Sequence, residues 1–187
     1  MPGNRLLRLT ALLLSILAFA TATWAFARVA GTSSPWMGLP LMSCVLGLSR
    51  VAEPFFTLKL PGWARPIRSW EGQAGVYRRL AVDEFGDLLR DTPLRVLNLD
   101  VYVSRGRHHL REVLTHVESA EASHFWAAAV LMPFLVFAIR DRTWGIFGCL
   151  LIVQAIVNLY PIMHLRRVRG RLERVSSRVR AGRRPAP

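Results

Sequence analysis

Two ionisable side chains, spaced for acid–base chemistry, stand where an apolar stretch of this 187-residue chain begins. Glu121 and His124 are three residues apart, so on a helix they share one face. A carboxylate beside an imidazole fixes the tautomer and raises the basicity of the ring, which is what a general base requires. The alternative is a hydrated helix start, where the helix dipole favours a glutamate.

A second polar set lies in the next apolar stretch, where Asn158 precedes Arg166 by two helical turns. Hydrogen bonding to a neighbouring helix is the ordinary use of such an asparagine. It could equally orient Glu121 or a substrate hydroxyl. The two stretches are joined by a short connection, so they are expected to be antiparallel neighbours. We therefore expect Glu121, His124, Asn158 and Arg166 to converge at one depth.

Metal chemistry is disfavoured by the same residues. A di-iron bundle uses two Glu-x-x-His helices with further glutamates, and this chain has one such motif. His108-His109 is its only histidine pair. Cys44 and Cys149 both lie in apolar runs, so neither a disulfide framework nor a zinc ribbon is indicated. The sequence thus predicts no metal and no tightly bound cofactor.

The composition indicates a membrane protein of the all-α class. Apolar residues make up 52% of the chain, and 25 Lys and Arg residues face 12 Asp and Glu residues, for a net charge of +13. This apolar content excludes a disordered chain. About 20 apolar helical residues span a bilayer. Four uncharged runs predict four spans: Leu9–Ala27, Trp36–Ser49, Phe125–Ile139 (begun near Glu118 or Glu121) and Trp144–Met163.

Two of these runs leave questions open. The run at Trp36–Ser49 is short and interrupted by Gly and Pro residues, so it is expected to be kinked or re-entrant. The run at Leu9–Ala27 imitates a cleavable signal peptide, but its length favours a helix that is retained.

The basic residues predict the orientation. Nearly all of them lie before the first span, between the second and third spans, or after the fourth. Because positive charge gathers on the cytoplasmic side, both termini and the long middle segment should be cytoplasmic. The chain then divides into residues 1–50 with two membrane segments, a cytoplasmic or interfacial segment 51–116, a pair of spans in 117–165, and an Arg-rich tail 166–187.

The middle segment and the tail are expected to be largely helical. Helical periodicity predicts an amphipathic helix from Gln73 to Arg90, ended by Pro93. Leu94–Val103 fits a short strand or an extended loop, and Arg107–His116 a helix that runs into the third span. The tail should continue the fourth helix, fray from Arg183, and attract anionic lipid. No aromatic residue is interleaved with its arginines, so nucleic acid is not an expected partner.

The motifs in the second half of the chain resemble those of the glycosyl-4,4'-diaponeurosporenoate acyltransferase family, whose members are small bacterial membrane proteins. The resemblance covers roughly residues 70–175. It rests on these segments: Trp70-Glu71, Gly75-Val76-Tyr77-Arg78-Arg79-Leu80, Glu121-x-x-His124-x-Trp126, Asn158-x-Tyr160-Pro161 and Arg166-x-x-Arg169-x-Arg171. The chain departs from the family pattern at Leu165, Arg167 and Val168, where members carry Gln, Tyr and Asn, and it inserts Phe125 before Trp126.

This resemblance implies an enzyme of the bacterial inner membrane that moves a fatty acyl group to a sugar hydroxyl of a glycosylated carotenoid or similar glycolipid. The donor would be an acyl-CoA or acyl-carrier thioester. His124 would take the hydroxyl proton while Glu121 holds the imidazole. Asn158, Arg166 and Arg169 would bind substrate, with the arginines gripping phosphates or the developing oxyanion. Direct transfer is preferred because no serine or cysteine is placed beside His124 as an acyl-enzyme nucleophile, except Ser119 and Ser123, which lie on adjacent helix positions.

Two other functions stay open on the sequence. One is a non-catalytic membrane scaffold or accessory protein that binds anionic lipid and a partner, and the other is a different lipid-modifying enzyme. The acceptor, the donor, the acyl length and the oligomeric state are not encoded in any motif of the chain.

Overall fold

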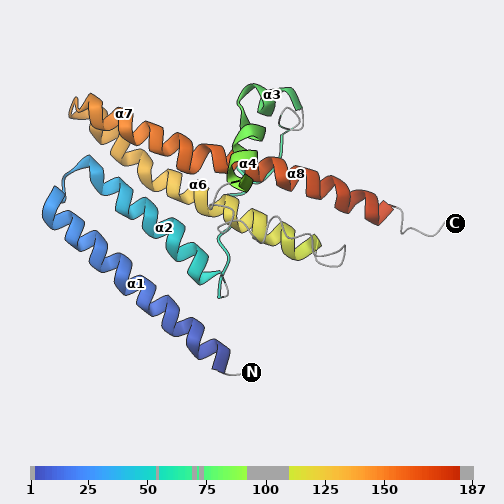
Figure 1. Cartoon of the computed structure of the whole chain (residues 1–187), viewed down its shortest axis with the longest axis horizontal. Helices are drawn as coiled ribbons and strands as arrows, with labels where there is room; N and C mark the ends of the chain where they lie inside the picture. The colour runs from blue at the N-terminus through green and yellow to red at the C-terminus, as the bar shows by residue number, and fades with distance from the viewer. Residues whose placement is uncertain (1–2, 54, 69–70, 72–73, 92–109, 182–187) are drawn as a thin grey trace. The chain divides into compact units, whose positions relative to one another are not determined.

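The computed structural model of the chain describes residues 3–53, 55–68, 71, 74–91 and 110–181. All regular elements within these ranges are helical, without a strand, which confirms the predicted all-α class. The possible strand at Leu94–Val103 lies outside them. The elements, labelled in Figure 1, are α1 (Gly3–Ala30), η1 (Pro35–Met37), α2 (Gly38–Ala52), α3 (Ala74–Arg79), α4 (Val82–Asp91), α6 (Leu110–Arg140), α7 (Trp144–Val153), the π-helix η5 (Gln154–Leu159) and α8 (Tyr160–Ala181).

The chain forms two compact units. The first comprises Met1–Leu58 and Ala122–Leu159, and the second comprises Lys59–Glu121 and Tyr160–Pro187. Helix α6 and the helix formed by α7, η5 and α8 each contribute residues to both units.

The first unit begins with two helices, α1 and α2, which lie side by side in opposite directions (Figure 1). α1 is followed by Gly31, whose φ of 84° lies in the left-handed region, and the Gly31 N–H donates to the Ala27 carbonyl at 3.0 Å. A Cβ atom on Gly47 of α2 would collide with the ring of Phe19 in α1. The two backbones therefore approach closely because position 47 has no side chain.

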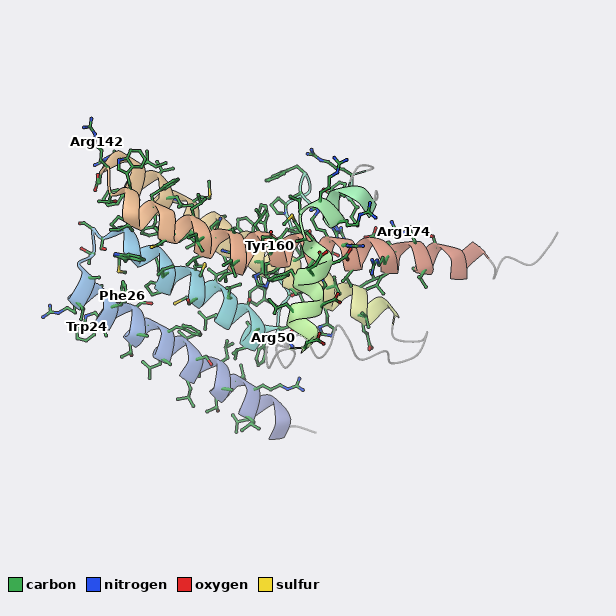
Figure 2. The ribbon with its side chains drawn as sticks, turned by 45° about the horizontal axis from the view of Figure 1, so that its top comes forward. Trp24, Phe26, Arg50, Arg142, Tyr160 and Arg174 are labelled. Atoms are coloured by element: carbon green, nitrogen blue, oxygen red, sulfur yellow. The ribbon has the colours of Figure 1, made fainter. Side chains whose placement is uncertain are left out.

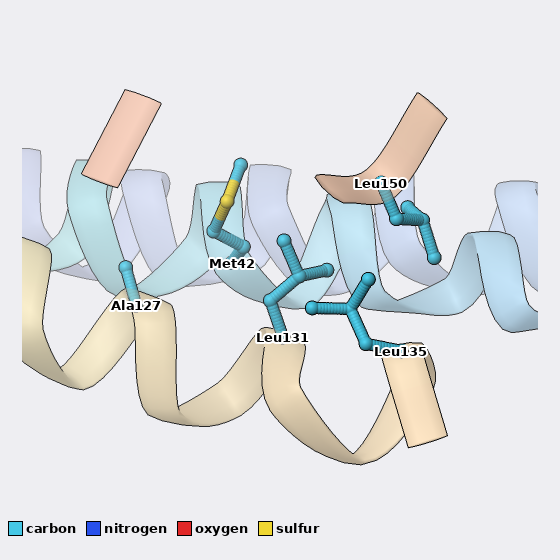
Figure 3. Close-up of a cluster of buried hydrophobic side chains, with 5 residues drawn as sticks. All are labelled: Met42, Ala127, Leu131, Leu135 and Leu150. Carbon is cyan, nitrogen blue, oxygen red and sulfur yellow. The ribbon is translucent and has the colours of Figure 1, made fainter. Parts of the chain in front are cut away.

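The first unit has a small core of buried apolar side chains. Its members come from α2, α6 and α7, as Figure 3 shows: Met42, Ala127, Leu131, Leu135 and Leu150. Leu131 and Leu150 are fully buried. Gly38 of α2 packs so tightly on this core that a Cβ atom there would lie 2.6 Å from Leu131 Cδ1. This contact fixes α2 on α6.

Among the residues that the structure describes, three helices are long and apolar enough to cross a membrane, by length and composition: Leu6–Ala30, Glu112–Arg140 and Trp144–Ser177. They coincide with three of the four predicted spans. α2 has 15 residues, so it rises about 22 Å, against about 30 Å for the hydrocarbon core of a bilayer. A fourth crossing at α2 therefore stays a prediction.

Apolar side chains lie on every side of α1. None of the most apolar window of this helix is buried, and large side chains such as Leu13, Leu17 and Trp24 are exposed. Trp24 and Phe26 stand near its C-terminal end (Figure 2). A helix that is hydrophobic on every side but covered on only one is typical of contact with lipid.

α6 is one helix of 31 residues that begins at Leu110. The predicted helix at Arg107–His116 and the predicted third span are thus one continuous element within the described residues. It rises about 46 Å, longer than the hydrocarbon core. Glu118, Glu121 and His124 all lie on this helix.

The single helix predicted from Gln73 to Arg90 is wrong. The chain forms α3 and α4 there, separated at Ala81, whose φ of 52° is left-handed. The break allows α4 to pack on α8. Gly86 of α4 meets His164, with 2.6 Å from the position of a Cβ atom to Cε1, and the Phe85 ring lies 5.3 Å from that of Tyr160.

The last long helix passes through a π-helical segment before α8. Pro161 has no N–H, so it cannot donate to the carbonyl of Val157 four residues earlier. The π-helix at Gln154–Leu159 comes directly before this proline, as expected where the α-helical ladder is interrupted. α8 then continues to Ala181, which confirms the predicted extension of the fourth helix. The predicted fraying from Arg183 lies outside the described residues.

Candidate functional site

The predicted site residues fall into two groups, one in each compact unit. Glu121, Arg166 and Arg169 belong to the second unit, and His124 and Asn158 belong to the first. Each group is described by itself.

Arg166 of α8 is the centre of the group in the second unit. Its Nε donates to Glu71 Oε2 at 3.1 Å, and its Nη2 donates to both oxygens of Glu71 at 3.2 and 3.0 Å. Nη1 donates to the Ala64 carbonyl at 2.7 Å and to Glu121 Oε1 at 3.0 Å. Nη2 also donates to the Pro66 carbonyl at 2.8 Å. A guanidinium has five N–H donors, and these four partners can engage all five.

Arg169, one turn further along α8, completes the group. Its Nε forms an ion pair with Glu121 Oε2 at 3.0 Å, and its Nη2 donates to the Arg65 carbonyl at 2.7 Å. The Glu121 side chain is fully buried, and that of Arg169 is 3% exposed. Burying a charge is costly unless it is paired and hydrogen-bonded. Here two carboxylates, Glu71 and Glu121, balance two guanidinium groups.

The backbone around residue 65 takes part through three consecutive carbonyl groups, those of Ala64, Arg65 and Pro66. We call residues 64–67 the strap. Ile67 of the strap lies on Gly170 of α8, with 3.4 Å from its Cδ1 to the position of a Cβ atom. The Arg65 side chain does not join these contacts. It is 63% exposed and forms an ion pair with Glu118 at 2.7 Å.

Tyr77 and Arg167 form a neighbouring contact in the second unit. The Arg167 guanidinium lies over the Tyr77 ring, 5.8 Å from its centroid, and forms an ion pair with Asp83. Burial raises the pKa of Tyr77, and the Glu71 carboxylate adds to this effect while Arg166 and Arg167 oppose it. The phenol is therefore neutral at physiological pH. Arg167 is one of the departures from the family pattern, and in this chain it connects α8 to α3 and α4.

Asn158, in the π-helix, is the centre of the group in the first unit. Its side chain is fully buried. Nδ2 donates to Gln154 Oε1 at 2.8 Å and lies 3.2 Å from Met42 Sδ. Gln154 in turn donates to the Ala128 carbonyl of α6 at 3.2 Å. This chain of polar contacts ties the π-helix to α6 within the first unit.

His124 lies beside the Asn158 side chain and the Val157 backbone. Two buried polar atoms of this group, His124 Nδ1 and Asn158 Oδ1, have no partner of good hydrogen-bond geometry among the residues that the structure describes. Buried polar atoms are nearly always satisfied, so these two atoms call for an explanation, and a bound ligand would supply one. A ligand that carries hydroxyl groups could donate to both.

The structure thus brings Glu121 together with Arg166 and Arg169, and His124 together with Asn158. The predicted role of Glu121 in holding the imidazole stays a prediction. In the structure both oxygens of Glu121 form ion pairs with the two arginines. Phosphate or oxyanion binding by these arginines also stays a prediction. In the described part of the chain, no group of three or more His, Cys, Asp or Glu side chains is placed to hold a metal ion.

Sequence reasoning did not assign Glu71, Gln154 or the strap carbonyls to the site. Glu71 did carry a signal, because it is an acidic residue in a segment that resembles the family. The strap carbonyls carry none, since any residue type presents a carbonyl group.

The fold and the two groups describe a helical protein with three candidate membrane spans and buried polar groups on the helices that contain two of them. Residues 61–178 match the family described as glycosyl-4,4'-diaponeurosporenoate acyltransferase. The chain therefore belongs to this family, and the match includes every residue of both groups except Met42. The family name indicates an acyltransferase. No curated protein and no solved structure matches the chain.

Proposed function

We propose that this protein is an integral membrane enzyme that transfers a fatty acyl group from a thioester donor to a sugar hydroxyl of a glycosylated carotenoid or a similar glycolipid. Family membership supports the reaction class. The apolar helices support a substrate that reaches the site from the bilayer.

The observation that carries the proposal is a pair of buried atoms in the first unit, His124 Nδ1 and Asn158 Oδ1, that lack a partner of good hydrogen-bond geometry among the described residues, although the two side chains lie beside each other. In the imidazole tautomer that carries its proton on Nε2, both atoms accept hydrogen bonds. Neighbouring hydroxyl groups of one sugar ring can donate to them together. The sugar would thereby be oriented with one hydroxyl on His124, and a ligand without such hydroxyls would leave both acceptors unsatisfied.

The reaction then needs only one general base. His124 takes the proton of the hydroxyl as its oxygen attacks the thioester carbonyl carbon. The tetrahedral intermediate collapses with cleavage of the carbon–sulfur bond. The thiolate that leaves takes the proton from the imidazolium, which gives an ester and a thiol. Direct transfer of this kind needs no acyl-enzyme and no metal.

We further propose that the protein is a multi-pass protein of a bacterial inner membrane, with α2 as a fourth crossing and both termini in the cytoplasm. The asymmetry of basic residues supports this orientation. Ser33→Cys and Asp141→Cys, each in a Cys44→Ala/Cys149→Ala background, should react with a membrane-impermeant maleimide added to intact cells. A cysteine appended after Pro187 should react only after lysis, and the reverse pattern would refute the orientation.

The function is tested by lipid mass spectrometry in a host that makes a carotenoid glucoside. Strains without the protein, with it, with His124→Ala and with His116→Ala are compared, and immunoblots of the membranes equalise the amount of protein. A product heavier by one fatty acyl group should appear with the intact protein and with His116→Ala, a matched histidine on the same helix. His124→Ala should lower the rate about 10²–10⁴-fold, the usual contribution of a general base.

Each other outcome has a distinct meaning. An undiminished product with His124→Ala refutes the role of His124. No new lipid with any strain, although the protein is present in the membrane, refutes this acceptor and favours the non-catalytic scaffold.

A further inference from the structure

We propose that Arg166 and Arg169 are positioning residues that hold the strap and Glu71 on α8, and that Arg166 does not bind the acyl donor. Glu71 is then itself a positioning residue. The effect on catalysis rests on the proposed function, whereas the structural role does not.

The first step of the argument is the number of donors. The five N–H groups of Arg166 can all be matched to Glu71, Glu121, Ala64 and Pro66. A phosphate or an oxyanion would need at least two of these donors. It could obtain them only by displacing the Glu71 carboxylate or the strap carbonyls, and each displaced group would lose its partner.

The second step is the charge. An anion is attracted by unpaired positive charge, and in this group both guanidinium groups already lie in ion pairs. Arg166 and Arg169 are paired with the carboxylates of Glu71 and Glu121 at distances of 3.0 Å. The side chains of Glu71 and Arg166 are 7% and 14% exposed, so solvent screens these pairs weakly. The arrangement is therefore that of a structural ion-pair group and not of an open anion site. We call these four residues, Glu71, Glu121, Arg166 and Arg169, the clamp.

The third step is what the clamp holds. The clamp holds three consecutive backbone carbonyl groups of the strap. Two arginine side chains of α8 thereby fix the path of the strap, which has no regular secondary structure. Two residues at the start of the strap are exposed: Trp63, which directly precedes it, is 73% exposed, and the side chain of Arg65 is 63% exposed. Aromatic and basic side chains of this kind suit the headgroup region of a bilayer. The clamp thus presents them from a fixed backbone.

The test uses the full chain, purified in detergent and reconstituted in vesicles. Ile67→Cys is introduced with Cys44→Ala and Cys149→Ala, and the rate of maleimide labelling reports whether the strap stays on Gly170. Arg166→Lys keeps the charge but lacks the planar fork, and Glu71→Gln keeps the shape but loses the charge. We expect either change to raise the labelling rate about tenfold or more. Glu118→Gln, which removes an exposed pair with the strap, should leave it within about twofold.

The same variants without the added cysteine are assayed for acyl transfer from acyl-CoA to a glycolipid. A positioning role predicts that kcat falls while KM for the donor stays within about twofold, because ground-state binding of the donor is untouched. A tenfold rise in KM without a change in labelling would overturn the proposal and make Arg166 a donor ligand. Unchanged labelling in folded Glu71→Gln would also overturn it.

Two safeguards separate the possible failures. If Glu71→Gln does not accumulate, Glu71→Asp keeps the charge on a shorter side chain and should show a smaller rise in labelling. If the intact protein has no acyltransferase activity, the proposed function fails, but the labelling rates still decide whether the clamp exists.

Discussion

The sharpest test of the buried charge group compares two glutamates of one helix. Glu121 and Glu118 are three residues apart in α6, and each pairs with arginine. Glu121 is fully buried between Arg166 and Arg169 at 3.0 Å, whereas the side chain of Glu118 is 23% exposed and its partner Arg65 is 63% exposed. The chemical change Glu→Gln is the same at both positions, so the difference between the two variants isolates the effect of burial.

The magnitude follows from the charge balance. Glu121→Gln leaves two buried guanidinium groups facing one carboxylate, Glu71, and turns an amide N–H₂ toward one of the two arginines. Removing one partner of a buried ion pair costs about 3–5 kcal/mol, so the free energy of unfolding should fall by that amount. Glu118→Gln should lower it by less than about 1 kcal/mol, as for other exposed pairs.

The measurement is reversible unfolding in mixed micelles, followed by helical circular dichroism. The double variant Glu121→Gln/Arg169→Gln restores the balance of charge, so its loss of stability should be smaller than the sum of the single losses. We expect a coupling of about 1–3 kcal/mol in the cycle. If Glu121→Gln and Glu118→Gln differ by less than about 0.5 kcal/mol, the buried pairs do not stabilise the second unit and the reasoning is wrong.

Three further predictions follow from other contacts. Gly47→Val should destabilise the packing of α1 on α2 by about 1–3 kcal/mol because its side chain meets the Phe19 ring, whereas Gly148→Val, with open space around it, should be neutral in the same thermal unfolding assay. Asn158→Leu should cost about 1–3 kcal/mol because it leaves the partly buried acceptor Gln154 Oε1 without its donor; chemical denaturation checks this. Burial raises the pKa of Tyr77 above its ordinary 10.0, so the folded chain holds the phenolic proton more tightly than the unfolded chain. This contribution to stability is complete below about pH 10 and is lost as the pH rises through the folded pKa. Tyr77→Phe should remove that alkaline loss, and an unchanged alkaline profile would contradict it.

The helices that could be predicted are those whose apolar runs determine them. The uncharged run after Arg8, and the run that ends at Arg140, each become one long helix. The break at Ala81 could not be predicted, because no glycine or proline marks it. It serves packing between α4 and α8, where Gly86 meets His164, and such packing overrides a local helical period.

The site shows the same division between local and distant information. The spacing of Glu121 and His124 is local, and antiparallel neighbours suffice to suggest a contact with the following helix. The pairing of Glu71 with Arg166 joins residues 95 positions apart in the chain. No spacing rule reaches that far. Backbone acceptors such as the carbonyl of Pro66 have no signature in the sequence at all.

The closed clamp has an evolutionary consequence. Because Glu71, Glu121, Arg166 and Arg169 balance one another in a buried place, the loss of any one leaves the others with an uncompensated charge. A lineage that changes one of them should therefore change a second, through pairs such as Arg166 with Glu71. We expect these four positions to be inherited together or replaced together across the family, while an exposed position such as Glu118 drifts freely.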